Sequence, residues 1–179
     1  DDIIITGKRH DFYSEYEVGF DEIGVILGLK IKLASRCGSS PDLSQAINER
    51  ALLHIDNAYY LENVLIENYL CKTNTASNTA FRGFGGNQGM MAIENIIDHI
   101  ANFLKKDSAE IRRRNFYQKK KKNITHYNMK VEDNIIQEIF DQLLKTSNYK
   151  GRQLDIKKFN SESKYIKKGI AITPVKFGI

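Results

Sequence analysis

The sequence has no long apolar run and only two cysteines. A membrane-spanning helix needs roughly 20 consecutive apolar residues, and no segment approaches that length, so we expect no membrane association. Cys37 and Cys71 lack metal-ligand spacing and are too few for a disulfide framework. We expect two small buried side chains in a reducing, cytoplasmic environment. The chain begins without a methionine or a signal peptide, so we expect a fragment of a longer protein.

The net charge of +5 is concentrated in two basic runs, Arg112–Arg114 and Lys119–Lys122. We interpret them as a solvated helix end followed by a basic surface loop. A nucleic-acid interface would need a basic stripe interleaved with exposed aromatic residues or a recognisable module, and neither is present. A non-catalytic module that binds phosphate or nucleic acid remains the alternative from another class. It predicts an affinity that falls steeply with salt.

A glycine-rich stretch, Thr73–Gly89, is the most informative part of the chain. It places Phe81, Arg82 and Phe84 among glycines and then enters a predicted helix. Glycines permit positive φ, and the start of a helix presents free N–H groups. The guanidinium of Arg82 offers a planar set of donors suited to oxyanions. The pattern favours a site for a planar anionic ligand, although a tight loop with packed glycines and core phenylalanines is the other interpretation.

The spacing of apolar residues predicts an α+β protein with mixed sheets and packed amphipathic helices. The predicted strands span 3–6, 12–20, 25–34, 63–70 and 169–177, and the predicted helices span 42–54, 90–104, 108–115, 133–147 and 149–160. The second and third of these strands form an antiparallel hairpin. Ser40 or Asp42 is expected to cap the first helix, and Asp107 the third. Residues 119–128 are a predicted linker at a domain boundary.

Arg50 lies on the apolar side of the first predicted helix. That side comprises Leu43, Ala46, Ile47, Ala51 and His54. A guanidinium that points inward is costly unless an anion meets it. The sequence leaves two interpretations open, a buried ion pair with a carboxylate elsewhere or an arginine directed into a ligand pocket.

Several ordered segments together resemble the molybdenum-cofactor-binding part of the molybdenum hydroxylases of the xanthine oxidase family. These segments are Ile5–Phe12, Arg50-Ala51, His54-x-Asp56-Asn57, Lys72–Asn74, Ser77–Gly86 and Thr173–Ile179. The last one, with Val131–Asn134, is closest to the separate molybdenum-binding subunits of bacterial enzymes. The similarity extends along the whole chain.

This resemblance implies an oxidoreductase with xanthine dehydrogenase activity, which oxidises hypoxanthine and xanthine to urate with oxygen taken from water. It implies a molybdenum–molybdopterin cofactor, with 2Fe–2S clusters, FAD and the final acceptor NAD⁺ served by other domains or a partner subunit. The implied partners are a purine substrate, the rest of the molybdenum-binding subunit and a second copy in a dimer. The cofactor supplies the difficult chemistry, and the protein supplies position and electrostatics.

The resemblance also implies roles for individual residues. Arg50 matches the arginine that binds the substrate and stabilises charge on its oxygen, and Phe84 matches the phenylalanine that lies on the purine ring. Phe81, Arg82 and Gly83 match the cofactor-binding loop, in which the backbone of Arg82 faces the ligands of the metal. An aldehyde oxidase-like enzyme acting on aldehydes or other N-heterocycles is the nearest alternative, but it would generally lack an arginine at position 50.

The sequence departs from the family pattern at Asn87 and Glu62, where proline is common. The resemblance implies that residues 1–122 are the C-terminal portion of a first molybdopterin-binding domain and residues 123–179 the start of a second. The catalytic glutamate, a second aromatic that clamps the substrate and most pterin contacts would lie outside these residues. We therefore expect the fragment to be inactive alone.

Overall fold

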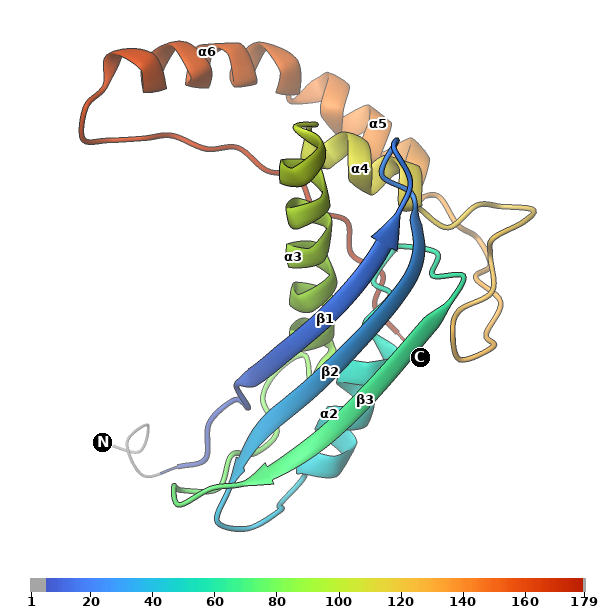
Figure 1. The fold of residues 1–179 in the computed structure, drawn as a ribbon, viewed down its shortest axis with the longest axis vertical. Coiled ribbons are helices and arrows are strands. Elements are labelled where there is room, and N and C mark those ends of the chain that lie inside the picture. The colour runs from blue at the N-terminus through green and yellow to red at the C-terminus, as the bar shows by residue number, and fades with distance from the viewer. Residues whose placement is uncertain (1–5, 179) are drawn as a thin grey trace.

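The computed structural model describes residues 6–178, which form a mixed three-stranded sheet with helices on one side (Figure 1). The sheet order is β1 (Phe12–Phe20), β2 (Ile26–Gly38) and β3 (Val64–Lys72). β1 and β2 pair antiparallel, which confirms the predicted hairpin. β3 pairs with β2 in parallel. This pairing requires a crossover, and the helix α2 (Ser44–Leu53) provides it.

The two faces of the sheet differ because successive side chains of a strand point to opposite sides. One face of β2 places Leu29, Ile31 and Leu33 in the core, each no more than 3% exposed. Between them, Lys30 and Lys32 point to the other face and form ion pairs with Glu17 and Glu67 on the neighbouring strands. The buried face therefore lies toward the helices and the charged face lies away from them.

The helix α3 (Gly86–Leu104) packs against α2, β1 and α4 (Ser108–Asn115). Its core residues Ile93, Ile97 and Ile100 recur at helical spacing and are at most 1% exposed. Asp107 caps α4 as predicted, because its Oδ1 accepts a hydrogen bond from the Ala109 N–H at 2.6 Å. Beyond α4, the helices α5 (Ile136–Thr146) and α6 (Tyr149–Glu162) extend away from the sheet (Figure 1).

Three local predictions were wrong. Residues 169–177 form no strand, because Pro174 has no N–H and the Lys176 N–H bonds to the Asn57 side chain instead of a neighbouring strand. Neither Ser40 nor Asp42 caps α2, whose N-cap Leu43 makes no side-chain capping bond. Cys71 is exposed because it pairs with Arg36 and therefore points to the charged face of the sheet, whereas Cys37 is buried as predicted.

Arg112 also differs from the prediction of a solvated basic run. Its side chain is 2% exposed and forms ion pairs with Glu94 and Asp98 at 2.7 and 2.9 Å. The predicted strand at 3–6 lies, apart from Thr6, outside the described residues. The domain boundary near residue 122 stays a prediction. Within residues 6–178, no helix combines the length and apolar character that crossing a bilayer requires.

Candidate functional site

The glycine-rich loop is fixed to the end of β2 before it reaches Phe81. Asn78 is 4% exposed, its N–H donates to the Cys37 carbonyl at 2.9 Å, and its Nδ2 donates to the Arg36 carbonyl at 2.8 Å. The Thr79 N–H donates to the Lys8 carbonyl at 3.0 Å. A buried residue whose backbone N–H and side-chain amide both bond to carbonyls of β2 restricts the loop to one conformation at this point. The residues after Thr79 therefore begin from a defined position.

The loop then turns sharply at three consecutive residues with positive φ. The values are 95° for Gly83, 46° for Phe84 and 90° for Gly85. A non-glycine residue rarely adopts such a φ, and such strain concentrates at functional sites. A Cβ added to Gly85 would lie 1.9 Å from the Ile47 carbonyl oxygen of α2. The turn thus brings Phe84 close to α2, which carries Arg50.

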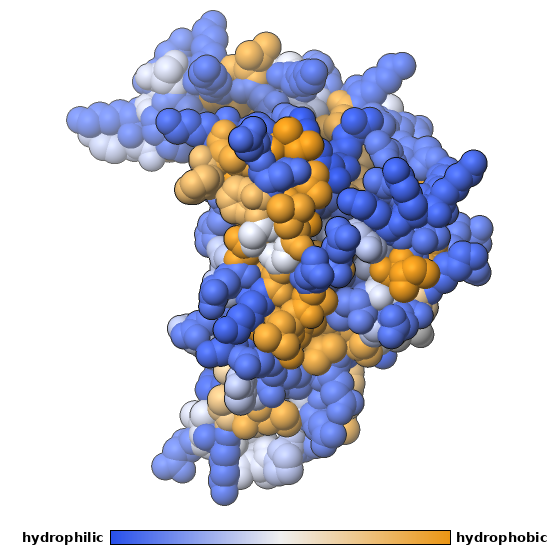
Figure 2. Space-filling model, turned by 45° about the vertical axis from the view of Figure 1, so that its right-hand side comes forward, coloured by the Kyte–Doolittle hydropathy of each residue, from blue (hydrophilic) through white to orange (hydrophobic). Residues whose placement is uncertain are grey.

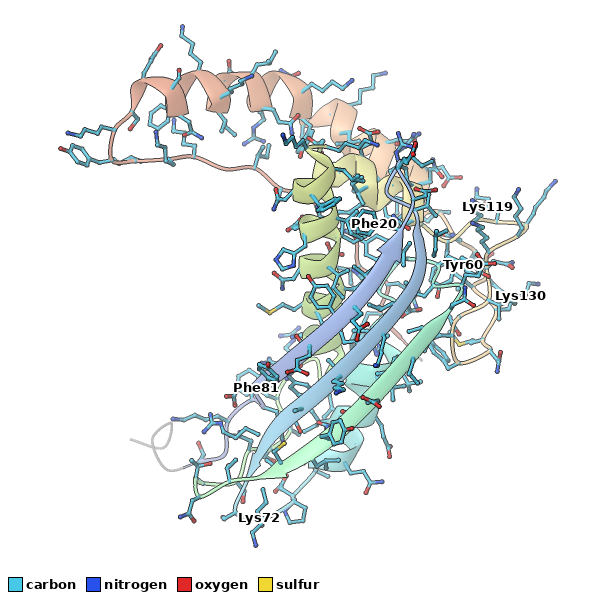
Figure 3. All side chains as sticks on the ribbon, viewed as in Figure 1. Phe20, Tyr60, Lys72, Phe81, Lys119 and Lys130 are labelled. Carbon is cyan, nitrogen blue, oxygen red and sulfur yellow. The ribbon has the colours of Figure 1, made fainter. Side chains whose placement is uncertain are left out.

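Arg9 contacts the outer side of the same loop and stabilises it. Its guanidinium carbon lies 4.5 Å from the centroid of the Phe81 ring, and its Nη2 donates to the Arg82 carbonyl at 2.6 Å. Figure 3 shows Phe81 beside the start of β1, to which Arg9 leads. The Asn87 side chain lies across Gly83, and its Nδ2 also approaches the Arg82 carbonyl at 3.4 Å. The asparagine at this position is therefore accommodated in the turn.

The loop offers free donors on its exposed side. Among the described residues, the amide N–H groups of Arg82 and Gly83 have no hydrogen-bond acceptor, and neither does the Arg82 guanidinium. The N–H of Gly85 also has no acceptor, but Gly85 is buried. The loop also leads directly into the N-terminus of the 19-residue helix α3. The loop therefore suits an anionic ligand rich in oxygen atoms, because it combines free N–H groups, a cation and a helix N-terminus.

Arg50 and Phe84 come together although 34 positions separate them. The guanidinium carbon of Arg50 lies 5.9 Å from the centroid of the Phe84 ring. A third residue, Phe177, contributes a ring whose centroid lies 6.0 Å from the same carbon. Arg50 is half-buried at the edge of the α2 core face, and Leu43 is 49% exposed, so the predicted apolar side was too wide.

Arg50 has no carboxylate partner between residues 6 and 178, so the ion-pair interpretation finds no support in the described chain. The guanidinium faces two aromatic rings and keeps its donors available. The same part of the chain contains no cluster of three or more His, Cys, Asp or Glu side chains that could hold a metal ion. The donor set therefore suits an anion or a polar ligand oxygen better than a bare cation.

A buried histidine supports the position of Arg50. The His54 Nδ1 lies 2.9 Å from the Arg50 carbonyl oxygen, so the neutral ring with a proton on Nδ1 donates this bond. Burial lowers the pKa of His54, although the hydrogen bond to Arg50 opposes that shift. The ring also packs against Phe177 at 5.0 Å between centroids. His54 therefore links the end of α2 to the C-terminal segment.

Sequence reasoning missed Arg9 and Phe177 as neighbours of the predicted site residues. Both occur in segments that carried the resemblance, Ile5–Phe12 and Thr173–Ile179. No local pattern relates either one to its contact, because Arg9 is 72 positions from Phe81 and Phe177 is 127 positions from Arg50. The matching segments were the only signal that could have suggested them.

Comparisons with known proteins agree with this geometry. The family model of the molybdopterin cofactor-binding domain matches residues 1–116. The chain is 42% identical over its full length to xanthine dehydrogenase/oxidase of Mus musculus. It is 44% identical over its full length to xanthine dehydrogenase of Drosophila pseudoobscura pseudoobscura. In each case it spans 13% of the length of the relative.

Solved structures show the same fold. Quinoline 2-oxidoreductase from Pseudomonas putida 86 matches with a TM-score of 0.76 and 21% identity, covering 88% of this chain and 21% of that one. Aldehyde oxidoreductase from Desulfovibrio gigas matches with a TM-score of 0.70 and 22% identity, covering 89% and 17%. These structures confirm the α+β class. The family model and the two relatives confirm the resemblance found in the sequence. The chain belongs to the molybdopterin cofactor-binding domain family.

Proposed function

We propose that the chain forms one wall of the active site of a molybdenum hydroxylase that oxidises hypoxanthine and xanthine to urate, with NAD⁺ as the final electron acceptor. The observation that carries this proposal is the meeting of Arg50 and Phe84, 5.9 Å from guanidinium carbon to ring centroid. A cation beside an aromatic face suits a flat heterocycle with an oxygen at its edge. The full-length identity to xanthine dehydrogenases supports the choice of substrate.

Arg50 binds the oxygen of the substrate and stabilises the charge that develops there. A preorganised donor of this kind contributes about 3–4 kcal/mol to a transition state, by comparison with an oxyanion-hole donor. Phe84 packs on the ring of the substrate and fixes its plane. Aromatic pairs add about 0.5–1.5 kcal/mol beyond the area they bury. Together the two residues select for planar substrates with a polar edge.

Phe81, Arg82 and Gly83 hold the cofactor. The molybdenum cofactor, when bound, supplies the oxidation chemistry at the metal. Because the Arg82 carbonyl already accepts a hydrogen bond from Arg9, the free N–H groups of the loop are what remain to contact the ligands of the metal. Phe81 is 56% exposed and presents its ring beside them.

The remaining parts of the enzyme lie in other segments. These are the rest of the molybdenum-binding subunit with its catalytic glutamate, the 2Fe–2S clusters and the FAD, in a cytoplasmic dimer. Figure 2 shows apolar side chains gathered in a band on one face between polar margins. An exposed apolar band of this kind is typical of an interface and supports contact with the missing part of the protein. The fragment alone is expected to be inactive.

The test is Arg50→Met in the complete enzyme. We expect kcat/KM for xanthine to fall about 10²–10³-fold, because a preorganised charge that stabilises the transition state is lost. Arg50→Lys keeps a charge without the planar donors and should recover only part of the loss. Arg113→Met is the control, because Arg113 pairs with Asp141 on the surface and should leave the rate unchanged.

Unchanged xanthine turnover in Arg50→Met would refute the purine assignment. Oxidation of aldehydes by the unmodified enzyme, with no turnover of xanthine, would favour the aldehyde oxidase-like alternative. Molybdenum analysis of the same preparations checks that each variant carries its cofactor.

A further inference from the structure

The C-terminal segment is held in place by two buried side chains just beyond α2. Asn57 Nδ2 donates to the Pro174 carbonyl at 3.0 Å, and its Oδ1 accepts from the Lys176 N–H at 3.1 Å. Lys176 Nζ lies 2.9 Å from Asp56 Oδ2. Asn57 is 1% exposed and Asp56 is fully buried. One amide that pairs with groups two residues apart fixes the register of the segment as a strand partner would.

These contacts, here called the Asn57 latch, rest on a rigid base. Glu94 Oε1 of α3 accepts a second hydrogen bond from Asn57 Nδ2 at 2.8 Å. The Tyr117 hydroxyl donates to Asp56 Oδ2 at 2.7 Å. Asn57 itself adopts a φ of 42°, a conformation that asparagine tolerates better than most residues. The latch therefore fixes residues 174–176 relative to α2 and α3.

The residue that follows the latch is Phe177, and its ring fits against the start of α3. A Cβ added to Gly86 would lie 2.8 Å from Phe177 Cε2, so only glycine at this position lets the ring come so close. The ring also packs on His54 and lies beside the Arg50 guanidinium. Phe177 is still 55% exposed, so one part of the ring remains accessible.

We propose that Phe177 is a positioning residue for Arg50, and that the Asn57 latch sets its place. With no carboxylate among the described residues to orient it, the Arg50 guanidinium takes its direction from the Phe84 and Phe177 rings. The inference rests on the proposed function, in which Arg50 binds the oxygen of the substrate. It predicts that Phe177 matters only for substrates that use Arg50.

The experiment compares two substrates in the complete enzyme. Xanthine carries oxygen atoms attached to its ring, one of which Arg50 would bind, whereas benzaldehyde carries no oxygen apart from that of its aldehyde group. Phe177→Ala should lower kcat for xanthine about tenfold, since cation–π contacts of this kind are weak individually, and should change kcat for benzaldehyde less than about twofold. Phe177→Tyr keeps the ring and should restore the xanthine rate. Val175→Ala is the matched control, because Val175 lies on the same segment and is 66% exposed.

A second variant displaces the ring without removing it. Gly86→Ala leaves Arg50 and Phe177 intact but places a methyl group where the Phe177 ring lies. It should reproduce the selective loss of xanthine turnover. Because the Phe177 side chain is still present in Gly86→Ala, such a loss would not come from a cavity left by its removal.

The outcomes separate this proposal from the function on which it rests. Equal losses of kcat for both substrates would show that Phe177 has a general structural role and would overturn the positioning role. Unchanged xanthine turnover in Phe177→Ala, with impaired turnover in Arg50→Met, would also overturn it. If Arg50→Met itself leaves xanthine turnover unchanged, the proposed function fails and the role of Phe177 fails with it. A selective loss in both Phe177→Ala and Gly86→Ala supports the positioning role.

Discussion

Glu94 on α3 accepts hydrogen bonds from three side chains, which belong to two other parts of the chain. Its Oε1 accepts from the Tyr59 hydroxyl at 2.6 Å and from Asn57 Nδ2 at 2.8 Å, and its Oε2 accepts from Arg112 Nε at 2.7 Å. Arg112 is 2% exposed and depends on Glu94 and Asp98 for its charge balance. A buried charge that loses its partner is strongly destabilising. This network also supports the Asn57 latch.

We predict that Glu94→Ala lowers the free energy of unfolding by about 3–5 kcal/mol, because it leaves the Arg112 guanidinium buried with one partner fewer. Urea unfolding followed by circular dichroism measures the change. Arg113→Ala is the control, since its pair with Asp141 is half exposed and should contribute about 1 kcal/mol or less. Equal effects of the two variants would contradict a special role for Glu94.

At the scale of elements, two helices approach closely enough to require glycine. A Cβ added to Gly89 of α3 would lie 2.2 Å from the Ala51 carbonyl oxygen of α2, and the neighbouring atoms are also backbone. Backbone cannot move aside as a flexible side chain can. The contact between α2 and α3 sets the separation of Arg50 from the loop that carries Phe84.

We expect Gly89→Ala to destabilise the protein by about 1–3 kcal/mol, the usual cost of overpacking. The sign of this change in the free energy of unfolding is informative, because replacing glycine by alanine inside a helix otherwise stabilises a protein by roughly 0.5–1 kcal/mol. Thermal unfolding compares this variant with Gly19→Ala, where an added Cβ would meet nothing within 4 Å. Stabilisation by Gly89→Ala would show that α2 and α3 do not touch at this point.

For the whole molecule, histidines buried in their neutral form connect stability to pH. Burial lowers the pKa values of His10, His54 and His126 below the ordinary value of 6.5. Between the lowered and the ordinary pKa values, the unfolded chain binds more protons than the folded one. Protonation therefore favours unfolding, and stability falls as the pH drops through about 6.5.

The corresponding prediction is a lower free energy of unfolding at pH 5.5 than at pH 7.5, measured by urea titration at several pH values. His54→Gln should reduce the slope, because it removes one of the groups that gain a proton on unfolding. Gln142→Ala, a change at an exposed side chain that does not titrate, should preserve the slope. A stability that does not vary over this range would contradict the prediction.

The sequence by itself determined the elements whose signals are local. Apolar residues alternate along 12–20 and recur at helical spacing along α3, so the hairpin and the helix follow from short-range periodicity. Asp107 predicted the start of α4, because its capping hydrogen bond joins residues only two positions apart. The glycine-rich loop was also evident, since its residue types restrict it to a sharp turn. The family and the candidate residues followed from the matching segments.

Only the tertiary structure decided which residues meet. The parallel pairing of β3, the burial of Arg112 and the place of Phe177 beside Arg50 all join positions far apart in the chain. Residues 169–177 have the composition of a strand, yet the Pro174 carbonyl and the Lys176 N–H bond to the Asn57 side chain and not to a neighbouring strand. Local patterns specify the conformation a segment prefers, whereas its partners depend on the packing of the complete fold.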